Sequence, residues 1–540
     1  MPSLTSDNIS VKEDFQTLTQ NLEPLFKVLK PWLVARRWSG LKGIRIRQIE
    51  LLEQISILES GKSAIFAALV RITPCCGAAG KSGIFYIPIH LKLQEAKDGW
   101  MPVRCAEGVL QIREAEYSRE YNNFLLNGIA NSVTIDGQKG VLAFRSLQQV
   151  SGNLEAMTVA TLGRGDTTNI IVKVKTRRNL SLVVKTYKNV TESNPEPEML
   201  TALAKEGFNN APKLIGQMTY TGFKKPLVLA ILQRFEESEG DGRQPFSESL
   251  RDELRSISLE STSSLLLARK LGEIIASMHH SLRRSDAESL KVSLITENDI
   301  EAWQTRTRES LTDFLKEASS KGRRLDPFTS NFVTVTSSTA EKILTRLSGM
   351  QMMLGMVKIR THQDLHLAQL LLKQNGETDF LVIDFEGDPQ RTEEARREKE
   401  SPLRDLGTMS RSFSYLRYYV LSELLEEAGI RKSFEAIASH DLAPHIKRAA
   451  TTPRASYLEN WFSTSMEWEN KVRKTMIQAY LTKADSLGDK LLSTKVGYDE
   501  VDSMIRLWEI ERAIMEVNYE LHHRPPHLLI PLAGLLTLCL

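Results

Sequence analysis

The sequence has little of what marks several common protein classes. Its 540 residues include only four cysteines, and two of these are adjacent, a pair that rarely closes an unstrained disulfide. No CxxC spacing occurs, so neither a zinc site nor a disulfide framework is indicated. The formal net charge is only +3, because 70 Lys and Arg are balanced by 67 Asp and Glu. A nucleic-acid-binding protein would carry a concentrated basic excess, so we expect no nucleic-acid partner.

Long hydrophobic runs are also scarce. The N-terminal stretch lacks the apolar core of a signal peptide. The run from Leu528 to Leu540 is apolar, but it is too short and too interrupted by proline to span a bilayer. We therefore expect a docked terminal segment, no membrane partner and a cytoplasmic location. An apolar fraction of 41% over 540 residues is typical of a globular protein with two to four packed units.

Composition divides the chain into a strand-rich part and a helix-rich part. Residues 1–150 alternate short apolar runs with turn residues, as in Ile65–Ile72, which predicts a small sheet-rich module. Residues 151–240 continue with strands and include Lys225–Phe235, whose apolar run has the length of a buried strand. Helical patterns dominate residues 241–540. This order of elements predicts an α+β architecture with two lobes.

Two segments of the helix-rich part have clear helical periodicity. In SSLLLARKLGEIIASMHHSL the apolar positions share one helix face, and they are Leu267, Leu271, Ile274 or Ile275, and Met278. Near the end of the chain a second stripe recurs at steps of three and four, at Leu507, Ile510, Ile514, Val517 and Leu521. The second pattern predicts an amphipathic helix whose polar side carries Glu509, Arg512, Glu516 and Glu520.

The strongest chemical signal lies between residues 359 and 389, in IRTHQDLHLAQLLLKQNGETDFLVIDFEGDP. Two apolar stretches flank a predicted turn, and each has polar side chains beside it. The polar residues beside the first apolar stretch are His362, Asp364, His366 and Gln369. Those beside the second stretch are Asp384 and Glu386. The second pair directly follows FLVI, a run that predicts a buried strand. Carboxylates at a strand end are well placed to face a cleft.

This spacing suits phosphoryl transfer from ATP. The reaction needs little covalent help from a protein. It needs an acid to orient the acceptor hydroxyl, and oxygen ligands to hold Mg²⁺ against the phosphates. Kinases use an Asp, an amide side chain five positions later and a second Asp after a strand, and Asp364, Gln369 and Asp384 have that arrangement. We therefore expect ATP and Mg²⁺ as cofactors.

Other interpretations of these residues have less support. A single HxD or DFE triplet arises by chance in a chain this long, and His362 alone is typical of a hydrogen-bonded scaffold residue. A metal hydrolase would be expected to show HExxH or comparable ligand spacing, which is missing. A pseudokinase would be expected to have lost the base or the metal acid, whereas Asp364 and Asp384 are both present.

A kinase also needs a cation on the ATP phosphates, held by an acid. Lys185 in SLVVKTYKNV follows a β-branched strand, as the phosphate-contacting lysine of a kinase does. Glu198 in NPEPEML stands at the start of the next predicted helix and is the acid expected to pair with it. Lys188 and Glu196 are the alternative lysine and the alternative acid.

The loop LGRGDTTN, residues 162–169, precedes the lysine strand and is the expected phosphate-covering loop. Thr167 and Thr168 are its candidate phosphate contacts. The loop has no Walker pattern, and its Gly-Arg-Gly sequence also suits an ordinary hairpin turn.

From one end to the other, the chain resembles the maltokinase family, relatives of the aminoglycoside phosphotransferases with an extra N-terminal cap. PWLVARRWSGLKG resembles the family's RWFGGK-type opening, and HQDLHLAQLL resembles its catalytic HGDYHLGQ segment. VIDFEGDP followed by SPLRDLGTMSRSFSY is the nearest match, and LWEIERAIMEVNYELHHRPPHLLIPLAGLL resembles the family's ending. The resemblance implies a bilobal protein-kinase-like (aminoglycoside-phosphotransferase-like) fold. Its parts would be an N-terminal cap subdomain (residues 1–150), an ATP-binding N-lobe with its hinge (151–240) and a mostly helical C-lobe (241–540).

The resemblance also implies roles for the residues of the catalytic segment. Asp364 would be the catalytic base, and His366, two positions later, would contact the acceptor. Gln369 and Asp384 would be metal ligands, with Glu386 near the metal or the transferred phosphate.

On the nucleotide side, the resemblance makes Lys185 and Glu198 the ATP-positioning pair. LAILQRFEESEGDG resembles the family's hinge, which would hold the adenine by backbone groups around Gln233 and Phe235. Asp405, in PLRD, is expected to brace the catalytic loop.

Family members transfer the ATP γ-phosphate to the anomeric hydroxyl of maltose, giving maltose 1-phosphate and ADP. The resemblance therefore implies this activity, and a functional link to trehalose synthase or to enzymes that build α-glucan. A disaccharide site usually combines an aromatic platform with polar groups that bind hydroxyls. The candidates are Trp468, Tyr480, Trp508, Glu511, Tyr519 and Arg524, and core packing is the alternative for each aromatic residue.

The departures from the family pattern lie near the expected acceptor site. Gln363 and Leu365 replace Gly and Tyr on either side of the base, and His522 and His523 stand where a pair of Asn is usual. Such changes could move the acceptor from maltose to glucosamine or another sugar, as in glucosamine kinases that resemble this family. An aminoglycoside- or choline-type kinase would share the core motif but not the cap or the C-terminal ending. Maltose is the first expectation and glucosamine the alternative.

Overall fold

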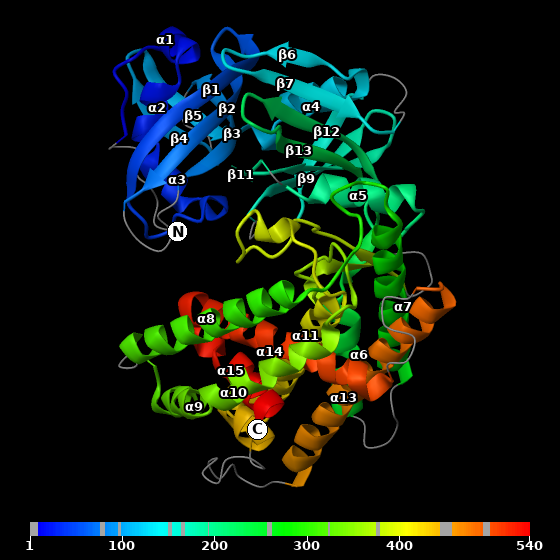
Figure 1. Ribbon diagram of the computed structural model, residues 1–540. Helices are drawn as coiled ribbons and strands as arrows, with labels where there is room; N and C mark the ends of the chain where they lie inside the picture. The colour runs from blue at the N-terminus through cyan, green and yellow to red at the C-terminus, as the bar shows by residue number, and fades with distance from the viewer. Residues whose placement is uncertain are drawn as a thin grey trace. The chain divides into compact units, whose positions relative to one another are not determined.

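A computed structural model gives the fold of the chain (Figure 1). The structure describes residues 9–75, 82–94, 99–148, 154–163, 168–192, 194–255, 262–321, 325–373, 379–442, 456–489 and 497–540. The chain packs as two compact units. Unit 1 comprises Met1–Leu200 and Pro212–Glu236, and unit 2 comprises Thr201–Ala211 and Glu237–Leu540.

Unit 1 contains two sheets, and the first has the strand order β1-β2-β3-β5-β4, with β11 paired to β3. Its strands are β1 (Ile46–Ser60), β2 (Ser63–Pro74), β3 (Gly83–Leu93), β4 (Met101–Cys105), β5 (Gly108–Glu114) and β11 (Asn189–Val190). Strand β2 is buried at successive positions, which is why its sequence is a continuous apolar run rather than an alternating one. Helices α1 (Phe15–Gln20), α2 (Glu23–Val28) and α3 (Lys30–Ala35) precede this sheet, and α2 packs against β1.

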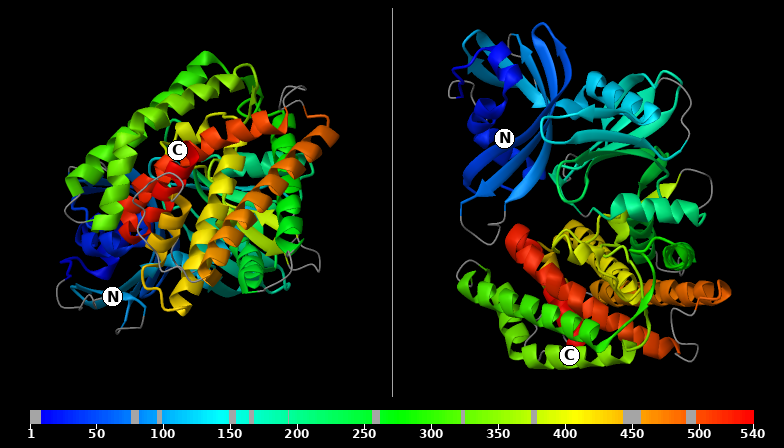
Figure 2. Two further views of the ribbon diagram at one scale, coloured as in Figure 1. Left: turned by 90° about the horizontal axis from the view of Figure 1, so that it is seen from below. Right: turned by 45° about the horizontal axis from the view of Figure 1, so that its top comes forward.

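The second sheet of unit 1 has the strand order β6-β7-β12-β13-β10-β9-β8. Its strands are β6 (Thr134–Asp136), β7 (Val141–Ser146), β8 (Ala156–Thr161), β9 (Ile170–Thr176), β10 (Ser181–Thr186), β12 (Leu214–Thr221) and β13 (Leu227–Arg234). Helix α4 (Arg119–Asn131) packs on β7, β8 and β12, and thus covers one face of the sheet (Figure 2). The apolar run expected to form a buried strand is β13, which lies in the interior of this sheet.

The predicted boundary at residue 150 does not coincide with the change from one sheet to the other. Strands β6 and β7, which the boundary assigned to the cap, belong to the second sheet because β7 pairs with β12. Strand β11, which the boundary assigned to the N-lobe, pairs with β3 of the first sheet. Unit 1 therefore contains both the expected cap and the expected ATP-binding strands.

Unit 2 is mainly helical. Its helices after α5 (Glu196–Lys205), which begins in unit 1, are α6 (Arg243–Arg255), α7 (Thr262–Arg284), α8 (Glu297–Lys321), α9 (Pro327–Ser338), α10 (Ala340–Arg346), α11 (Leu403–Glu427), α12 (Ser433–Leu442), α13 (Ser456–Ser486), α14 (Tyr498–His523) and α15 (Leu529–Cys539). Strands β14 (Ser238–Asp241), β17 (Leu370–Lys373) and β18 (Phe380–Val382) form a small sheet, and β15 (Ser293–Leu294) pairs with β16 (Val357–Lys358). The long helix α14 packs against both α8 and α11 (Figure 2).

The predicted helical stripes form the core of unit 2. All five apolar positions of the α14 stripe are buried, and so are the apolar positions predicted for α7. The apolar C-terminal segment forms α15, which packs against α12 and α14 as a docked helix.

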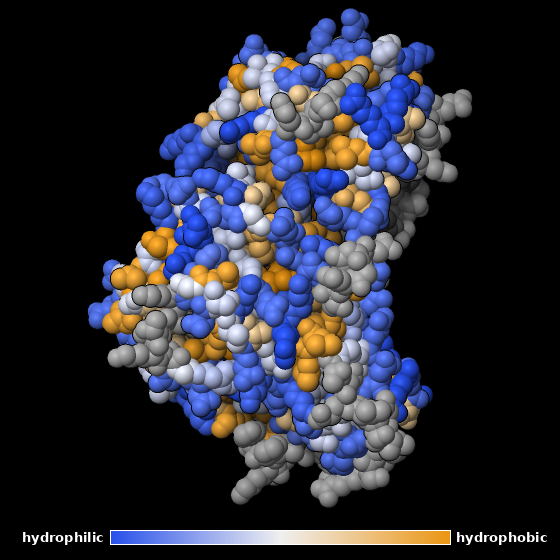
Figure 3. Space-filling model, turned by 90° about the vertical axis from the view of Figure 1, so that its right-hand side faces the viewer, coloured by the Kyte–Doolittle hydropathy of each residue, from blue (hydrophilic) through white to orange (hydrophobic). Residues whose placement is uncertain are grey.

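The described helices include none that is long and apolar enough to cross a membrane. On the face shown in Figure 3, hydrophilic residues predominate and the hydrophobic ones lie in separated patches.

Candidate functional site

The pairing of β17 with β18 brings the two halves of the catalytic segment together. Leu370 lies opposite Val382, and the Ile383 amide donates to the Gln369 carbonyl over 2.9 Å. The side chains that flank these positions therefore meet: Gln369 Nε2 donates to Asp384 Oδ2 over 3.1 Å. The turn expected between the two strands falls largely on residues 374–378, which lie outside the described residues.

Two residues of this segment have backbone conformations that are unusual for residues other than glycine. Gln363, directly before the expected base, and Asp384, directly after the β18 strand region, both have φ of 69°. The left-handed region costs most side chains roughly 1–2 kcal/mol, although Asp tolerates it better than most. Such conformations persist where surrounding contacts fix them, and they concentrate at functional sites.

The first of those contacts comes from Asp405 on α11. Its carboxylate accepts the backbone amides of His362 and Gln363 over 2.8 and 2.9 Å. Asp405 is fully buried, and its Oδ2 lies 3.0 Å from Nε2 of His279 on α7. Burial would raise the pKa of Asp405, but the hydrogen bond from His279 and the nearby charges keep it below the ordinary value. Asp405 is thus in the bracing position expected from the sequence.

His362 is part of the same scaffold. Its Nε2 lies 2.9 Å from the carbonyl oxygen of Ile383, so the imidazole links the loop that carries Asp364 to the residue after β18. The side chain is fully buried. This geometry fits a hydrogen-bonded scaffold residue better than an acid or a base.

Asp364 itself is held by an ion pair. Arg512 Nη1, from α14, lies 2.9 Å from Asp364 Oδ1, and His366 Nε2 lies 3.7 Å from Asp364 Oδ2. Burial would raise the pKa of Asp364, but the Arg512 charge, supported by His366, holds it well below the ordinary value. The carboxylate is therefore ionised at neutral pH and is held in one position.

Arg512 is a site residue that the sequence did not single out. The helical pattern placed it on the polar side of α14, with no partner. In the structure it joins Asp364 to Glu516: Arg512 Nε donates to Glu516 Oε1 over 3.3 Å, and Arg411 Nη2 donates to Glu516 Oε2 over 3.0 Å. The i, i+4 spacing of Arg512 and Glu516 was visible in the sequence, but the contact with Asp364 joins positions 148 residues apart.

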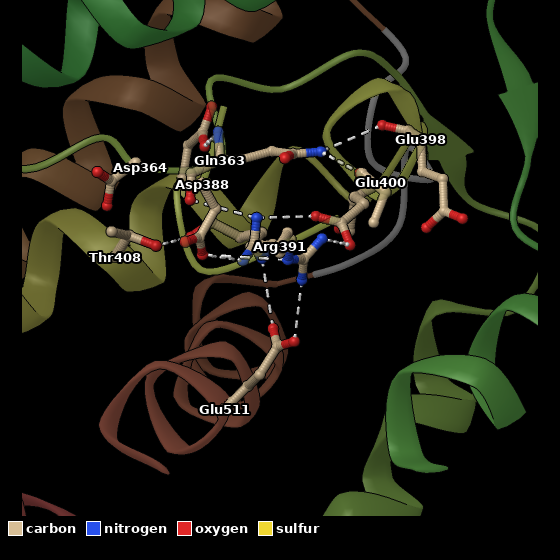
Figure 4. Close-up of polar contacts among 12 residues, drawn as sticks. Gln363, Asp364, Asp388, Arg391, Glu398, Glu400, Thr408 and Glu511 are labelled. Atoms are coloured by element: carbon tan, nitrogen blue, oxygen red, sulfur yellow. Dashed lines mark hydrogen bonds and ion pairs between the residues drawn. The ribbon is translucent and has the colours of Figure 1, made fainter. Parts of the chain in front are cut away.

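A network of arginines and carboxylates lies beside Gln363 and Asp364 (Figure 4). Its members are Arg306, Arg391, Arg404, Asp388, Glu400 and Glu511. Arg404 Nη1 donates to the backbone carbonyl of Gln363 over 3.2 Å, so the network holds the residue before Asp364. Arg391 Nη1 donates to Glu400 Oε1 over 2.7 Å, which ties down the segment before α11.

Glu511 belongs to this network and is not a free sugar ligand. It projects from α14 toward Arg391 in Figure 4, and Arg391 Nη2 donates to its Oε1 over 3.2 Å. Arg306 Nε and Arg404 Nε donate to its two oxygens over 2.8 and 3.4 Å. The sugar-contact prediction for Glu511 is therefore wrong in this structure, because three arginines occupy its carboxylate.

The buried aromatic residues among the sugar candidates belong to the core. Trp468 and Trp508 are each 1% exposed and Tyr480 is fully buried. The Tyr480 hydroxyl lies 3.1 Å from Nδ1 of His279, which in turn contacts Asp405. These three side chains therefore have no surface to offer a sugar, and core packing accounts for them.

Tyr519 and Arg524 differ from the other candidates because both are exposed. Tyr519 packs against His523 with ring centroids 4.7 Å apart, and the Arg524 guanidinium lies 5.3 Å from the Tyr519 ring centroid. Tyr519 is seven residues, about two helical turns, beyond Arg512 on α14. The exposed part of α14 near these two residues lies at its C-terminal end, whereas Glu516 and Glu520 on the same helix are buried.

The donors at the catalytic segment suit Mg²⁺. Asp384 offers a carboxylate, and the Gln369 amide donates its hydrogen to Asp384, which leaves its oxygen as a second ligand. Glu386, two residues later, is partly exposed. Carboxylate and amide oxygens are the ligands of hard divalent cations, so these residues fit the ion expected from the sequence.

The nucleotide-side residues lie in unit 1. Lys185 Nζ donates to Glu196 Oε2 over 2.6 Å, and the Tyr187 hydroxyl donates to the same oxygen over 2.6 Å. Lys185 and Glu196 are both buried. The ion pair is thus formed with the alternative acid, while Glu198 lies two residues further along α5 and is partly exposed. Both acids belong to the first turn of α5, which is why the sequence did not decide between them.

The expected hinge contacts are only partly available. Gln233 pairs with Val183 on one side and Leu214 on the other, inside the sheet. The Phe235 amide donates to the Ser181 carbonyl over 3.1 Å, so this N–H group is not free to bind adenine. In the expected phosphate loop, Thr168 is exposed two residues before β9, and Thr167 lies outside the described residues.

No protein-family model matches the chain. A glucosamine kinase from Streptacidiphilus jiangxiensis is 25% identical over 224 residues, which are 41% of this chain and 47% of that relative. The match thus spans about half of the relative's length. The structure of a glucosamine kinase in complex with glucosamine, ADP and inorganic phosphate superposes with a TM-score of 0.60 at 18% identity, covering 94% of this chain and 98% of that one. Another glucosamine kinase structure, crystal form B, gives a TM-score of 0.60 at 18% identity over 91% and 94% of the two chains.

At these identities the structural matches establish the fold. The chain has the α+β, protein-kinase-like (aminoglycoside-phosphotransferase-like) fold expected from its sequence. The relatives named here are glucosamine kinases, which the sequence had given as the alternative to the maltokinases.

Proposed function

We propose that this protein is an ATP- and Mg²⁺-dependent sugar kinase. One observation carries the proposal: Gln369 and Asp384 meet at 3.1 Å in the segment whose preceding loop holds the ionised Asp364. Phosphoryl transfer requires a positioned base for the acceptor hydroxyl and oxygen ligands for the metal ion. The fold supports the same conclusion, since it is shared with glucosamine kinases of known structure.

The residues of each unit have separate tasks in this proposal. Asp364 orients the acceptor hydroxyl and accepts its proton, while Arg512 keeps the carboxylate ionised and in place. His366, beside Asp364, contacts the acceptor. Gln369 and Asp384 hold Mg²⁺, which neutralises phosphate charge when bound, with Glu386 close by. Lys185, paired with Glu196, positions the ATP phosphates.

We propose glucosamine as the acceptor, with maltose as the second candidate. The named relatives support glucosamine, and so do the departures from the maltokinase pattern at Gln363, Leu365, His522 and His523. His522 is engaged on the protein surface, since its Nε2 lies 2.7 Å from Glu317 Oε2 on α8. The remaining sequence resemblance supports maltose, whose 1-phosphate would link the protein to α-glucan synthesis and trehalose synthase.

A sugar panel tests the proposal. ADP release from Mg·ATP is measured with glucosamine, maltose, glucose, trehalose, an aminoglycoside and no sugar, and product NMR locates the phosphate. Selective activity with glucosamine is the expected result. Selective activity with maltose, phosphorylated on the anomeric oxygen, would restore the maltokinase assignment with the same catalytic residues. No turnover above the no-sugar control with any acceptor would count against a sugar kinase.

A further inference from the structure

Strand β10 leads directly from one sheet of unit 1 into the other. Lys185 lies near the end of β10, in the seven-stranded sheet, and β11 begins at Asn189 in the six-stranded sheet. Side chains alternate along an extended chain, so Lys185 and Tyr187 share one side and Lys188 lies on the other. Lys185 and Tyr187 both contact Glu196. Lys188 instead contacts Glu116, in the segment that follows β5 of the six-stranded sheet.

The ammonium, the amide and the carbonyl of Lys188 each contact another residue. Its Nζ lies 2.5 Å from Glu116 Oε1 and 4.7 Å from the ring centroid of Trp38. Its amide donates to Asn169 Oδ1 over 3.3 Å, and its carbonyl accepts the Tyr86 amide of β3 over 2.9 Å. Both charged side chains are fully buried.

Glu116 is itself anchored in the segment that joins the two sheets. It lies in the short helix η3 (Ala115–Tyr117), between β5 of the first sheet and α4, which covers the second. Asn122 Nδ2 of α4 donates to the Glu116 carbonyl over 2.8 Å. The pair therefore joins the end of the lysine strand to the junction of the two sheets.

Stability does not by itself account for such a pair. Desolvating two charges is costly, and replacing a buried ion pair by apolar residues of similar volume is often neutral or stabilising. In some proteins a buried ion pair is retained because it fixes one arrangement of the elements that it joins. Here the arrangement is that of the strand that carries Lys185, three residues before Lys188.

We infer that Lys188 and Glu116 are positioning residues for the nucleotide, which hold Lys185 against Glu196. The six-stranded sheet thereby takes part in nucleotide binding without touching the nucleotide. This inference rests on the proposed function, because it assumes that Lys185 contacts the phosphates.

The test compares nucleotide and sugar binding in a double variant, Glu116→Leu with Lys188→Met, which removes both charges and retains much of the volume. We expect a folded protein whose affinity for Mg·ADP, measured by calorimetry, falls about tenfold because the phosphate-contacting lysine is misplaced. The KM for ATP should rise similarly, while the KM for the sugar stays within about twofold of the wild-type value. The matched control, Glu50→Leu with Arg71→Met, removes a partly exposed ion pair of the same sheet and should change neither affinity.

Two outcomes separate this inference from the proposed function. A wild-type protein that binds no Mg·ADP would overturn both. Wild-type binding that the double variant retains in full, or a loss shared equally by sugar and nucleotide, would overturn the inference alone. If the double variant does not fold, Lys188→Arg keeps the charge with a bulkier head group, and the same comparison of the two affinities applies to it.

Discussion

Asp364 is constrained at both its backbone and its side chain. Its backbone neighbours are held by Asp405, and its side chain is held by Arg512 at 2.9 Å. Asp364→Asn keeps the size of the side chain but removes its capacity to accept a proton. We expect kcat to fall by roughly 10²–10⁴-fold, the usual contribution of a positioned general base. Calorimetry should show unchanged Mg·ADP binding, because the nucleotide-side residues are untouched.

A matched control for this variant is Asp286→Asn, which alters an exposed aspartate of unit 2 that pairs with the exposed Lys205. It should have wild-type kcat. Near-normal turnover by the Asp364→Asn variant would remove Asp364 from the role of base.

The charge of Arg512 keeps the pKa of Asp364 low, so that this carboxylate is ionised over a wide pH range. Burial alone would raise the pKa of Asp364, and the Arg512 charge is what lowers it. Arg512→Gln removes that charge, so the pKa of Asp364 rises and the carboxylate becomes protonated at a higher pH. Because a base must be deprotonated, the acid limb of the kcat/KM profile should move upward in pH, together with a loss of kcat. Initial rates between about pH 5 and 9 test this: the wild-type protein should show no acid limb from Asp364 in that range, and the limb of the variant should move toward it.

The control for the pH profile is Arg506→Gln on the same helix, whose arginine is half-exposed and pairs with Asp502. Its acid limb should coincide with that of the wild type. An unmoved acid limb in the Arg512→Gln variant would show that another group sets the low-pH loss of activity.

At this scale, the sequence could predict contacts made within a short stretch of chain. Asp364, Gln369 and Asp384 lie within 21 residues of each other, and one strand pairing brings the last two together. Arg512 could not be assigned in this way, since only folding brings α14 to the base loop. The same limit made Glu511 a poor prediction, because its arginine partners come from three separate parts of the chain.

At the scale of elements, helix α14 shows what hydrophobic periodicity does and does not reveal. The apolar stripe was predicted correctly, since all its members are buried. The opposite face was predicted to be polar, and it is, yet Glu509, Glu516 and Glu520 are buried as well. Arg473 of α13 pairs with Glu509, Arg411 of α11 pairs with Glu516, and Arg524, directly after α14, pairs with Glu520. Periodicity therefore identifies the helix, but it does not show that both faces are covered.

The arginine network joins α14 to α8, α11 and the segment before α11, so we expect it to contribute strongly to stability. Arg404→Met leaves Glu400, Glu511 and Asp388 without one of their buried cations. Removing one partner of a buried ion pair typically costs about 3–5 kcal/mol. Urea denaturation should show this loss in the free energy of unfolding, whereas Glu500→Gln, an exposed change in the first turn of α14, should have almost no effect.

The pH dependence of that loss has a definite sign. Burial would raise the pKa of Glu511, but the charges of Arg306, Arg404 and Arg391 hold it below its ordinary value. A carboxylate with a lowered folded-state pKa stabilises the protein above its unfolded pKa, and the contribution disappears as the pH falls through the folded value. The difference between wild type and Arg404→Met should therefore be largest near neutral pH and shrink in acid. A difference that grows in acid would contradict this account.

At the scale of the molecule, the two-lobed α+β fold class could be predicted because its evidence is spread over the whole chain. The evidence consists of local properties of the sequence: a strand-rich half, a helix-rich half, and a predicted strand beside the expected catalytic segment. Together these properties indicate the fold class. The internal boundary at residue 150 could not be placed, because strand pairing across large separations decides it. Residues 141–146 pair with residues 216–221, and residues 189–190 pair with residues 84–85.

Nucleotide binding should stabilise the folded chain, and this gives a test of Lys185 and Glu196 that does not depend on the acceptor. A ligand that binds only the folded state adds about 2.7 kcal/mol of stability at a concentration 100 times its Kd. Mg·ADP should therefore raise the Tm of the wild-type protein. Lys185→Met removes the cation that pairs with Glu196 at 2.6 Å, so the Tm increase with Mg·ADP should largely disappear, while the increase with the accepted sugar remains.

Lys175→Met provides the matched control, because Lys175 is an exposed lysine on the neighbouring strand β9. It should show the full Mg·ADP response. Lys185→Met also removes a buried cation from Glu196, which keeps the hydrogen bond from the Tyr187 hydroxyl, so the Tm of this variant without ligand should fall. The decisive quantity is therefore the increase on adding Mg·ADP, measured from each variant's own baseline. An undiminished increase in the Lys185→Met variant would mean that the nucleotide phosphates are held elsewhere in the chain.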